Sequence, residues 1–306
     1  MQRAYLSKLM ELAEKDANVL HLVADSGTGF DEMFQRNFPG QMMNFGIAEE
    51  HMVGAAAGMA TAGKIPFVYT AGAFLAYRAF EFIRDDICFQ NLNVKIVGMG
   101  SGLAWSSLGP THHTTEDISV LRALPNLKIL SPSTPIQVAA CIEEAYNHKG
   151  PVYIRIGMNN EKEYFSDNYS VPASGQNVLK QDGKISVFTT GSILEEVMEA
   201  SEIMKENGVD TAVIDVTVVK PFDEDYFLQL IKKSELLITV EEHNVLGGLG
   251  GILSEVLATH GVGKKLIRIG LDDAFAKGYS KSQKAVRIQN SLDSESIAKR
   301  IMENLT

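Results

Sequence analysis

The stretch Phe45-Gly46-Ile47-Ala48-Glu49-Glu50-His51 opens a helix whose continuation, residues 52–60, consists almost entirely of small or apolar residues. Such a helix packs closely on its neighbours, and close packing carries the acidic first turn out of bulk water. Burying a carboxylate is energetically unfavourable, so an acidic residue in a buried helical turn indicates a chemical role. We therefore interpret Glu49 as a candidate catalytic acid. The alternative is that both glutamates are solvated and complement the positive end of the helix dipole.

Short runs rich in β-branched residues alternate with longer helical patterns on both sides of this helix. We predict strands at residues 19–24, 66–70, 94–98, 128–130, 152–156, 185–189, 211–218 and 236–240. We predict helices that begin near Gln2, Ile47, Phe74, Glu116, Pro135, Leu194 and Pro221. This alternation is typical of an α/β fold with mostly parallel sheets, here two doubly wound domains. A polar stretch from residue 161 to 183 places the first domain at 1–170, a linker at 171–182 and the second domain at 183–306.

Composition narrows the possible partners. The 306 residues carry a net charge of −10, which argues against nucleic acid because a phosphate backbone requires a basic surface. The chain has no uninterrupted apolar run of about 20 residues and no signal-peptide pattern, so we expect no membrane partner and a cytoplasmic location. Cys88 and Cys141 are the only cysteines, too few for a disulfide framework. We also assign no metal ligand to this chain.

Two further clusters carry side chains suited to chemistry. Phe74, Tyr77 and Phe80 follow one another at three-residue spacing, which predicts an aromatic stripe on one helix face. The stripe is either ordinary core or a platform for a flat heterocycle. His112 lies in a Gly-Pro loop before a helix, where it suits hydrogen bonding or proton transfer, although a solvated histidine remains the alternative.

The glycine-rich turn at residues 247–251 precedes a helix, as phosphate-binding loops do, and glycine amides in that position can bind an anion. It lacks the Lys-Ser/Thr ending of a P-loop and the spacing of a dinucleotide-binding turn. We therefore predict a tight packing turn.

Taken together, four segments resemble the transketolase family in order and approximate spacing: 46–49 (Gly-Ile-Ala-Glu), 74–80 (Phe-Leu-Ala-Tyr-Arg-Ala-Phe), 109–112 (Gly-Pro-Thr-His) and 240–250. The resemblance covers nearly the whole chain but only two of that family's domains, the pyrimidine-binding and C-terminal domains. The Gly-Asp-Gly motif, which in that family binds the cofactor's diphosphate and a metal, does not occur here. The resemblance implies a split enzyme, in which a separate N-terminal subunit holds the diphosphate and Mg²⁺ or Ca²⁺. It also implies a homodimer of this chain within a heterotetramer.

The resemblance implies a thiamine-diphosphate-dependent transferase that moves a two-carbon ketol unit from a ketose to an aldose. It assigns five cofactor-binding residues, namely Asp25, Glu49, Phe74, Tyr77 and Phe80. Glu49 would hydrogen-bond a ring nitrogen of the aminopyrimidine, and the three aromatic residues would form its pocket. His112 would act on the sugar donor, by binding a hydroxyl or developing oxyanion charge.

Departures from the family pattern concern the substrate. Leu108 stands where members that use phosphorylated sugars carry an aspartate, and Gly100 and Met158 fall near the positions of their phosphate-binding histidine and arginine. The resemblance therefore implies a sugar that is unphosphorylated, differently charged, or read by Arg155, Arg78 or the partner chain.

Other functions share parts of this pattern. The β subunit of a 2-oxoacid dehydrogenase decarboxylase has the same two domains, but His112 within Gly-Pro-Thr-His argues against it. Deoxyxylulose-phosphate synthase shares Gly-Ile-Ala-Glu, yet the spacing of the aromatic run favours transketolase. A catalytically silent scaffold subunit is the alternative from outside the enzymes.

Overall fold

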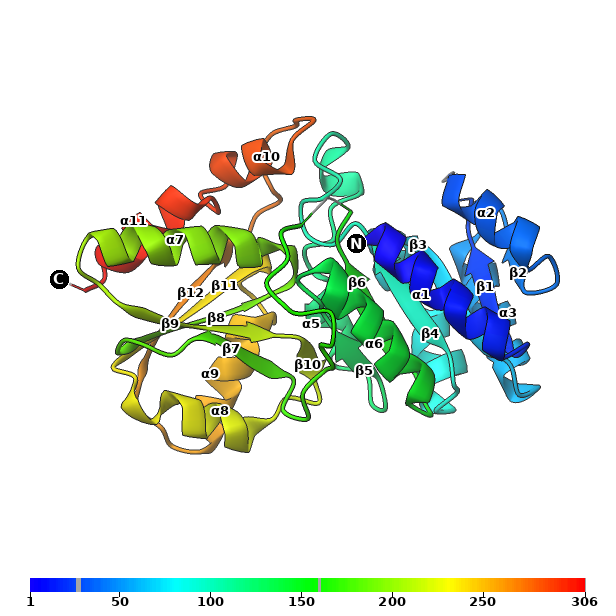
Figure 1. The fold of residues 1–306 in the computed structure, drawn as a ribbon, viewed down its shortest axis with the longest axis horizontal. Helices are drawn as coiled ribbons and strands as arrows, with labels where there is room; N and C mark the ends of the chain where they lie inside the picture. The colour runs from blue at the N-terminus through cyan, green and yellow to red at the C-terminus, as the bar shows by residue number, and fades with distance from the viewer. Residues whose placement is uncertain (26–28, 159–160, 306) are drawn as a thin grey trace.

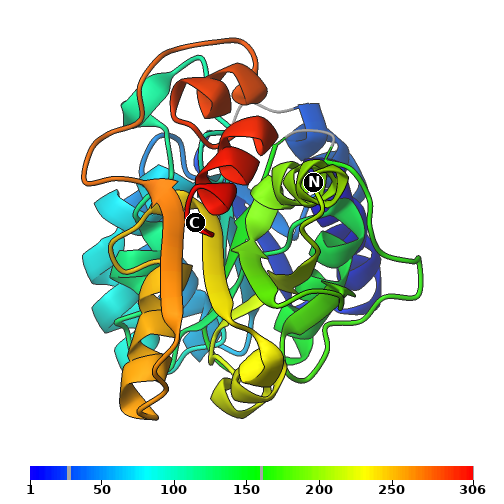
Figure 2. The same ribbon diagram turned by 90° about the vertical axis from the view of Figure 1, so that its left-hand side faces the viewer.

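The computed structural model describes residues 1–25, 29–158 and 161–305. Two α/β units lie side by side, the first carrying the N-terminus and the second the C-terminus (Figure 1). Figure 2 shows the second unit in front of the first. The expected α/β fold class is confirmed, and the two units correspond to two separate sheets.

The first sheet has seven strands in the order β10-β5-β6-β4-β3-β1-β2. Six parallel strands come from the first half of the chain: β1 (Val19–Val23), β2 (Met42–Asn44), β3 (Ile65–Ala71), β4 (Lys95–Met99), β5 (Lys128–Leu130) and β6 (Val152–Ile156). The seventh, β10 (Val218–Lys220), comes from the second half and pairs antiparallel with β5. The inner strands β1, β4 and β6 are buried along their whole length, which explains why most of their residues are apolar. Each of them also buries one titratable residue, namely His21, Lys95 and Arg155.

Helices cover both faces of this sheet. They are α1 (Gln2–Lys15), α2 (Gly29–Asn37), α3 (Glu49–Thr61), α4 (Phe80–Phe82), α5 (Asp117–Leu121) and α6 (Pro135–Asn147). Two π-helical segments, η1 (Phe74–Arg78) and η2 (Ile83–Phe89), flank α4, and a 3₁₀ turn, η3 (Gly109–Thr111), precedes α5. One core cluster joins the sheet to α1, α2 and α6, and a second joins it to α3, α5 and the π-helices. This arrangement is that of a doubly wound sheet.

The second sheet has the order β12-β11-β8-β9-β7. Its strands are β7 (Gln176–Lys180), β8 (Ile185–Thr190), β9 (Thr211–Val216), β11 (Leu236–Asn244) and β12 (Lys265–Leu271), of which only β7 is antiparallel to its neighbour. Its helices are η4 (Gly191–Ile193), α7 (Leu194–Glu206), α8 (Glu224–Leu230), η5 (Ile231–Lys233), α9 (Leu249–Thr259), α10 (Gln283–Gln289) and α11 (Ser294–Met302). Helices α7 and α11 share one core cluster, and α8 and α9 share another.

Four strands, β2, β7, β10 and β12, are not predicted from the sequence, and all four lie at sheet edges. Strand β7 falls within residues 171–182, the interval expected to be a linker, and its Gln-Asn-Val-Leu-Lys sequence is half-buried after the first residue. An edge strand needs apolar residues on one side only, so it lacks the mostly apolar sequence that marks inner strands. The predicted strand 211–218 ends at Val216, and Val218 begins β10 in the other sheet. Strands β2 and β12 also border their sheets.

Buried polar contacts join the two units. Asp215 at the end of β9 accepts hydrogen bonds from Gln137 Nε2 at 2.7 Å and from the Ser133 hydroxyl. Burial raises the pKa of Asp215 to about 6. Because Gln137 and Ser133 belong to the first unit and Asp215 to the second, these bonds fix one unit against the other. In the part of the chain that the structure describes, no helix combines the length and apolar character that crossing a membrane requires.

Candidate active site

The predicted site residues gather at one edge of the first sheet. Asp25 follows β1, Glu49 follows β2, Phe74 follows β3 and His112 follows β4. The carboxyl ends of parallel strands meet at the same edge, and ligands bind where the strand order reverses. That reversal falls at β1, whose neighbours are β2 on one side and β3 on the other. The topology therefore assembles side chains that are up to 87 residues apart in sequence, since 112 − 25 = 87.

Glu49 is the first residue of α3 and is 1% exposed. Its Oε2 accepts a hydrogen bond from Arg78 Nη1 at 2.6 Å, while the Arg78 side chain stays 42% exposed. The carboxylate thus lies at the positive end of the helix with a half-solvated cation beside it. The solvated-glutamate alternative is wrong for Glu49, whereas Glu50 is half-buried and His51 is exposed.

The aromatic run forms a π-helix followed by one turn of α4, and its three rings have different surroundings. Phe74 lies 4.5 Å beneath the Arg78 guanidinium carbon. The Tyr77 hydroxyl donates to Glu116 Oε2 at 2.8 Å and accepts from the Glu116 amide at 2.9 Å. Phe80 packs half-buried against the core. The prediction of a single stripe is wrong, because a π-helix has more residues per turn than the α-helix on which that prediction rested. The ordinary-core interpretation is also wrong for Tyr77, which is 38% exposed.

His112 ends the 3₁₀ turn η3 and lies among aromatic rings. Its ring meets Phe74 edge-on at 5.0 Å between centroids and lies 5.8 Å from Trp105. The Thr111 hydroxyl is 2.9 Å from its Nδ1. Burial, together with the positive charge of Arg78, lowers the pKa of His112 below 6.5. The imidazole is therefore neutral near pH 7 and can donate one hydrogen bond and accept another.

Contacts link these side chains into one group. Glu49 contacts Arg78, Arg78 covers Phe74, and Phe74 touches His112. From the sequence, Arg78 is predicted only to bind substrate charge, and no role is predicted for Trp105. The position of Arg78 within the aromatic run was a usable signal, whereas nothing in the sequence linked Trp105 to His112.

His113, next to His112, differs sharply from it. It is 2% exposed, and neither ring nitrogen has a hydrogen-bond partner among the described residues. Burial lowers its pKa below 6.5. His113 is therefore an uncharged buried side chain, and His112 is the histidine that remains half-buried at the sheet edge.

Asp25 and Arg155 lie outside the linked group. Asp25 is exposed and adopts a left-handed backbone with φ of 46°, held by a hydrogen bond from its amide to Asn44 Oδ1 at 3.1 Å. Arg155 is 1% exposed. Its Nε donates to Asp117 Oδ2 at 2.9 Å, and its Nη2 donates to the carbonyls of Thr114 and Glu242, both at 2.9 Å. These contacts give Arg155 a role in joining the units, and they correct the expectation that it reads substrate.

The glycine-rich turn before α9 binds a carboxylate of the chain itself. Glu241 is 1% exposed, and its two oxygens accept from the amides of Leu249 at 2.7 Å and Gly250 at 2.9 Å. A Cβ on Gly248 would overlap Glu241 and His243. The amides that could have held a phosphate are thus occupied, and the prediction of a packing turn is confirmed.

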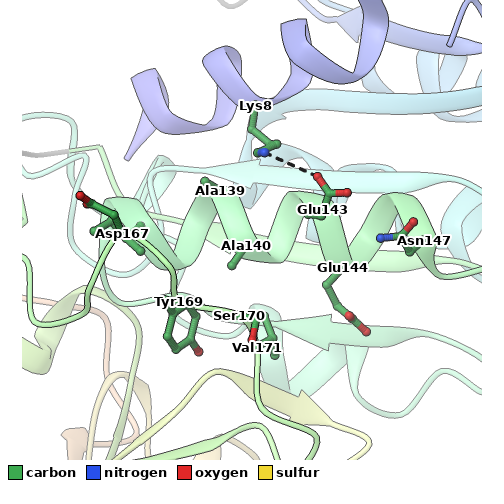
Figure 3. A pocket seen from close by; sticks show the side chains of 11 residues that line it. Lys8, Ala139, Ala140, Glu143, Glu144, Asn147, Asp167, Tyr169, Ser170 and Val171 are labelled. Carbon is green, nitrogen blue, oxygen red and sulfur yellow. Dashed lines mark ion pairs between the residues drawn. The ribbon is translucent and has the colours of Figure 1, made fainter. Parts of the chain in front are cut away.

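A groove of about 430 Å³ lies elsewhere, between α1, α6 and residues 167–171. Figure 3 shows Lys8 of α1 pointing toward Glu143 of α6, at 3.5 Å between charged atoms. Alanines line its floor, and neither the buried acid nor the site histidine reaches it. Among the residues that the structure describes, no group of three histidine, cysteine or acidic side chains could hold a metal ion.

Comparison with known proteins agrees with this geometry. Residues 1–161 match the transketolase pyrimidine binding domain, and residues 175–291 match the transketolase C-terminal domain. A Methanocaldococcus jannaschii protein whose name describes it as a transketolase C-terminal section is 38% identical over 100% of this chain and 96% of its own. A subunit of the apulose-4-phosphate transketolase of Actinobacillus succinogenes is 35% identical over 95% of this chain and 94% of its own.

Among solved structures, a split-gene transketolase described as an inactive β4 tetramer superposes with a TM-score of 0.87. It is 31% identical and covers 99% of this chain and 96% of its own. Both domains, their order and their full extent are therefore shared. The chain belongs to the transketolase family, as a subunit made of the pyrimidine-binding and C-terminal domains.

Proposed function

We propose that this chain is one subunit of a thiamine-diphosphate-dependent transketolase, which transfers a two-carbon ketol unit from a ketose to an aldose. The observation that carries the proposal is the burial of Glu49 at the sheet edge, in contact with Arg78 and, through Arg78 and Phe74, with His112. An aminopyrimidine needs an acid for its ring nitrogen and apolar faces for its ring. A buried carboxylate beside aromatic side chains supplies both, so the residues present fit this cofactor.

Each side chain then has a separate task. Thiamine diphosphate, when bound, supplies the electron sink for cleaving the carbon–carbon bond next to the ketose carbonyl. Glu49 holds the pyrimidine nitrogen and keeps a proton there, since a shielded carboxyl group forms strong charge-assisted hydrogen bonds. Phe74, Tyr77 and Phe80 bound the ring, and Asp25 lies at the same edge. Neutral His112 binds a donor hydroxyl or the oxygen on which negative charge develops.

A partner subunit is part of the proposal. One relative is named as a C-terminal section and another as a transketolase subunit, and the solved tetramer of a related chain is described as inactive. These names support a second polypeptide as partner. We propose that this partner carries the diphosphate-binding domain with Mg²⁺ or Ca²⁺. We propose a heterotetramer in which two copies of this chain pair with two copies of that partner.

The residues near His112 indicate where an anionic end of the substrate could bind. A side chain on Gly100 would overlap the Trp105 indole and approach the sulfur of Met158. An aromatic edge and a thioether thus occupy the place where the family resemblance would put phosphate-binding cations. The Actinobacillus relative is named for a phosphorylated sugar. We therefore propose that any anionic end of the substrate is read by Arg78 or the partner subunit rather than at Gly100 and Met158.

Reconstitution tests the function. The chain is mixed with the product of the neighbouring coding sequence, provided that it carries Gly-Asp-Gly, and cofactor binding is followed by calorimetry. Ketose–aldose pairs, pyruvate decarboxylation and condensation of pyruvate with glyceraldehyde 3-phosphate are then assayed in parallel. Ketol transfer supports the proposal. Decarboxylation with a dehydrogenase partner, deoxyxylulose phosphate formation, or cofactor binding without turnover would each point to one of the alternatives.

A further inference from the structure

Residues 272–282, here called the Tyr279 segment, connect β12 to α10 and reach from the second unit to the loop that carries His112. The amide of Ser280 donates to the carbonyl of Ser106 at 3.0 Å. The ring of Tyr279 lies against Gly109 so closely that a Cβ on Gly109 would overlap it. Figures 1 and 2 both place this orange segment beside the blue-green loop at the top of the molecule. The sequence alone predicts no function for this segment.

The segment is held firmly on its own unit. The Asn290 side chain, which follows α10, accepts from the Lys277 amide at 2.8 Å and donates to the Lys277 carbonyl at 3.0 Å. The Asn290 side chain thus bonds both backbone groups of Lys277. Gly278 has a φ of 84°, and a Cβ there would overlap Gln289. The segment next to Tyr279 is therefore also held from the α10 side, independently of the hydrogen bond between Ser280 and the loop.

Gly109 connects Tyr279 to His112. The Gly109 carbonyl accepts from the amides of His112 at 2.9 Å and His113 at 3.0 Å. Gly109 itself adopts a φ of 71°, a conformation that favours glycine. A displacement of Gly109 consequently moves the backbone of His112. Tyr279 is 68% exposed, so core packing does not explain why an aromatic ring stands there.

We propose that Tyr279 is a positioning residue that holds the Gly109 turn, and through it His112, in the orientation needed for the sugar donor. The Ser280–Ser106 hydrogen bond supports the same loop from the neighbouring residue. The proposal rests on the function proposed above, because it takes His112 to contact the donor. It gives the second unit a part in shaping the site of the first.

The first arm of the test uses the chain alone and requires no activity. Hydrogen–deuterium exchange is measured for residues 103–113 in the parent and four variants. Tyr279→Ala removes the ring, and Asn290→Ala removes the hydrogen bonds that hold the Tyr279 segment. We expect each substitution to raise the rate of amide exchange in this loop at least fivefold. Tyr279→Phe retains the ring, and Phe275→Ala removes another exposed aromatic side chain of the same segment. Both should match the parent.

The second arm uses the complex with the partner subunit. Tyr279→Ala should lower kcat with the donor at least tenfold and leave cofactor affinity within twofold, and Tyr279→Phe should restore the parent rate. Unchanged exchange in Tyr279→Ala overturns the proposal, as does increased exchange with parent kinetics. If the parent complex transfers no ketol unit, the proposed function fails, while the exchange measurements still decide whether Tyr279 holds the loop.

Discussion

Glu49→Gln separates the chemical role of the carboxylate from its part in folding. Glutamine keeps the shape of the side chain and one oxygen that can accept from Arg78. The ion pair that is lost has a partner that is 42% exposed, and pairs with a half-solvated member contribute about 1 kcal/mol or less. Loss of the interaction between the Glu49 charge and the positive end of α3 lowers the stability by about a further 0.3–1 kcal/mol. We therefore expect the free chain to lose at most about 2 kcal/mol of stability, which thermal denaturation would register as a shift of a few degrees.

The expected loss of activity is larger. A positioned acid or base contributes about 10²–10⁴-fold to a rate, or about 3–5 kcal/mol of transition-state stabilisation. Ketol transfer by the reconstituted complex should fall by that factor at saturating cofactor. Glu50→Gln is the matched control, because it removes the neighbouring charge from the same helical turn and should retain parent activity. The reasoning is refuted if Glu49→Gln keeps more than a tenth of the parent rate, or if Glu50→Gln loses as much.

Three other predictions concern the free chain. Lys95 is 0% exposed and donates to two backbone carbonyls and an amide oxygen, so Lys95→Met should lower the free energy of unfolding in urea by about 3 kcal/mol. The control Lys128→Met breaks a half-exposed ion pair and should change the free energy of unfolding by less than about 1 kcal/mol. Equal effects of the two substitutions would contradict this prediction. Because folding lowers the pKa of His112, its stabilising contribution is complete above pH 6.5 and is lost as the pH falls through the folded-state value. NMR titration of labelled histidine should show Arg78→Gln raising that pKa toward 6.5, since a repelling charge is removed; an unchanged value would contradict this cause. Glu241→Ala leaves two buried amides of α9 unpaired and should lower the free energy of unfolding by about 2–3 kcal/mol, whereas a change below about 1 kcal/mol would show that water replaces the carboxylate.

The inner strands and the buried acid could be predicted from the sequence. Strands β5 and β6 begin and end as predicted, because a parallel strand covered on both faces consists mostly of apolar and β-branched residues. Such runs are local signals, and they stay recognisable in β6 although Arg155 interrupts it. The burial of Glu49 followed from the small residues after it, which bring the helix close to its neighbours. The alignment of candidate residues on one sheet edge followed from the α/β pattern itself.

Only the tertiary structure decided which side chains those residues meet. The sequence placed Arg155 at the end of a strand. Its partners come from elsewhere: Asp117 begins α5, Thr114 precedes that helix, and Glu242 lies on β11 of the second unit. The same holds for β10, which leaves its own unit to pair with β5, and for Tyr279, which lies against Gly109. Local patterns report the burial that each residue requires, whereas contacts between distant segments depend on how the sheets and loops are placed in space.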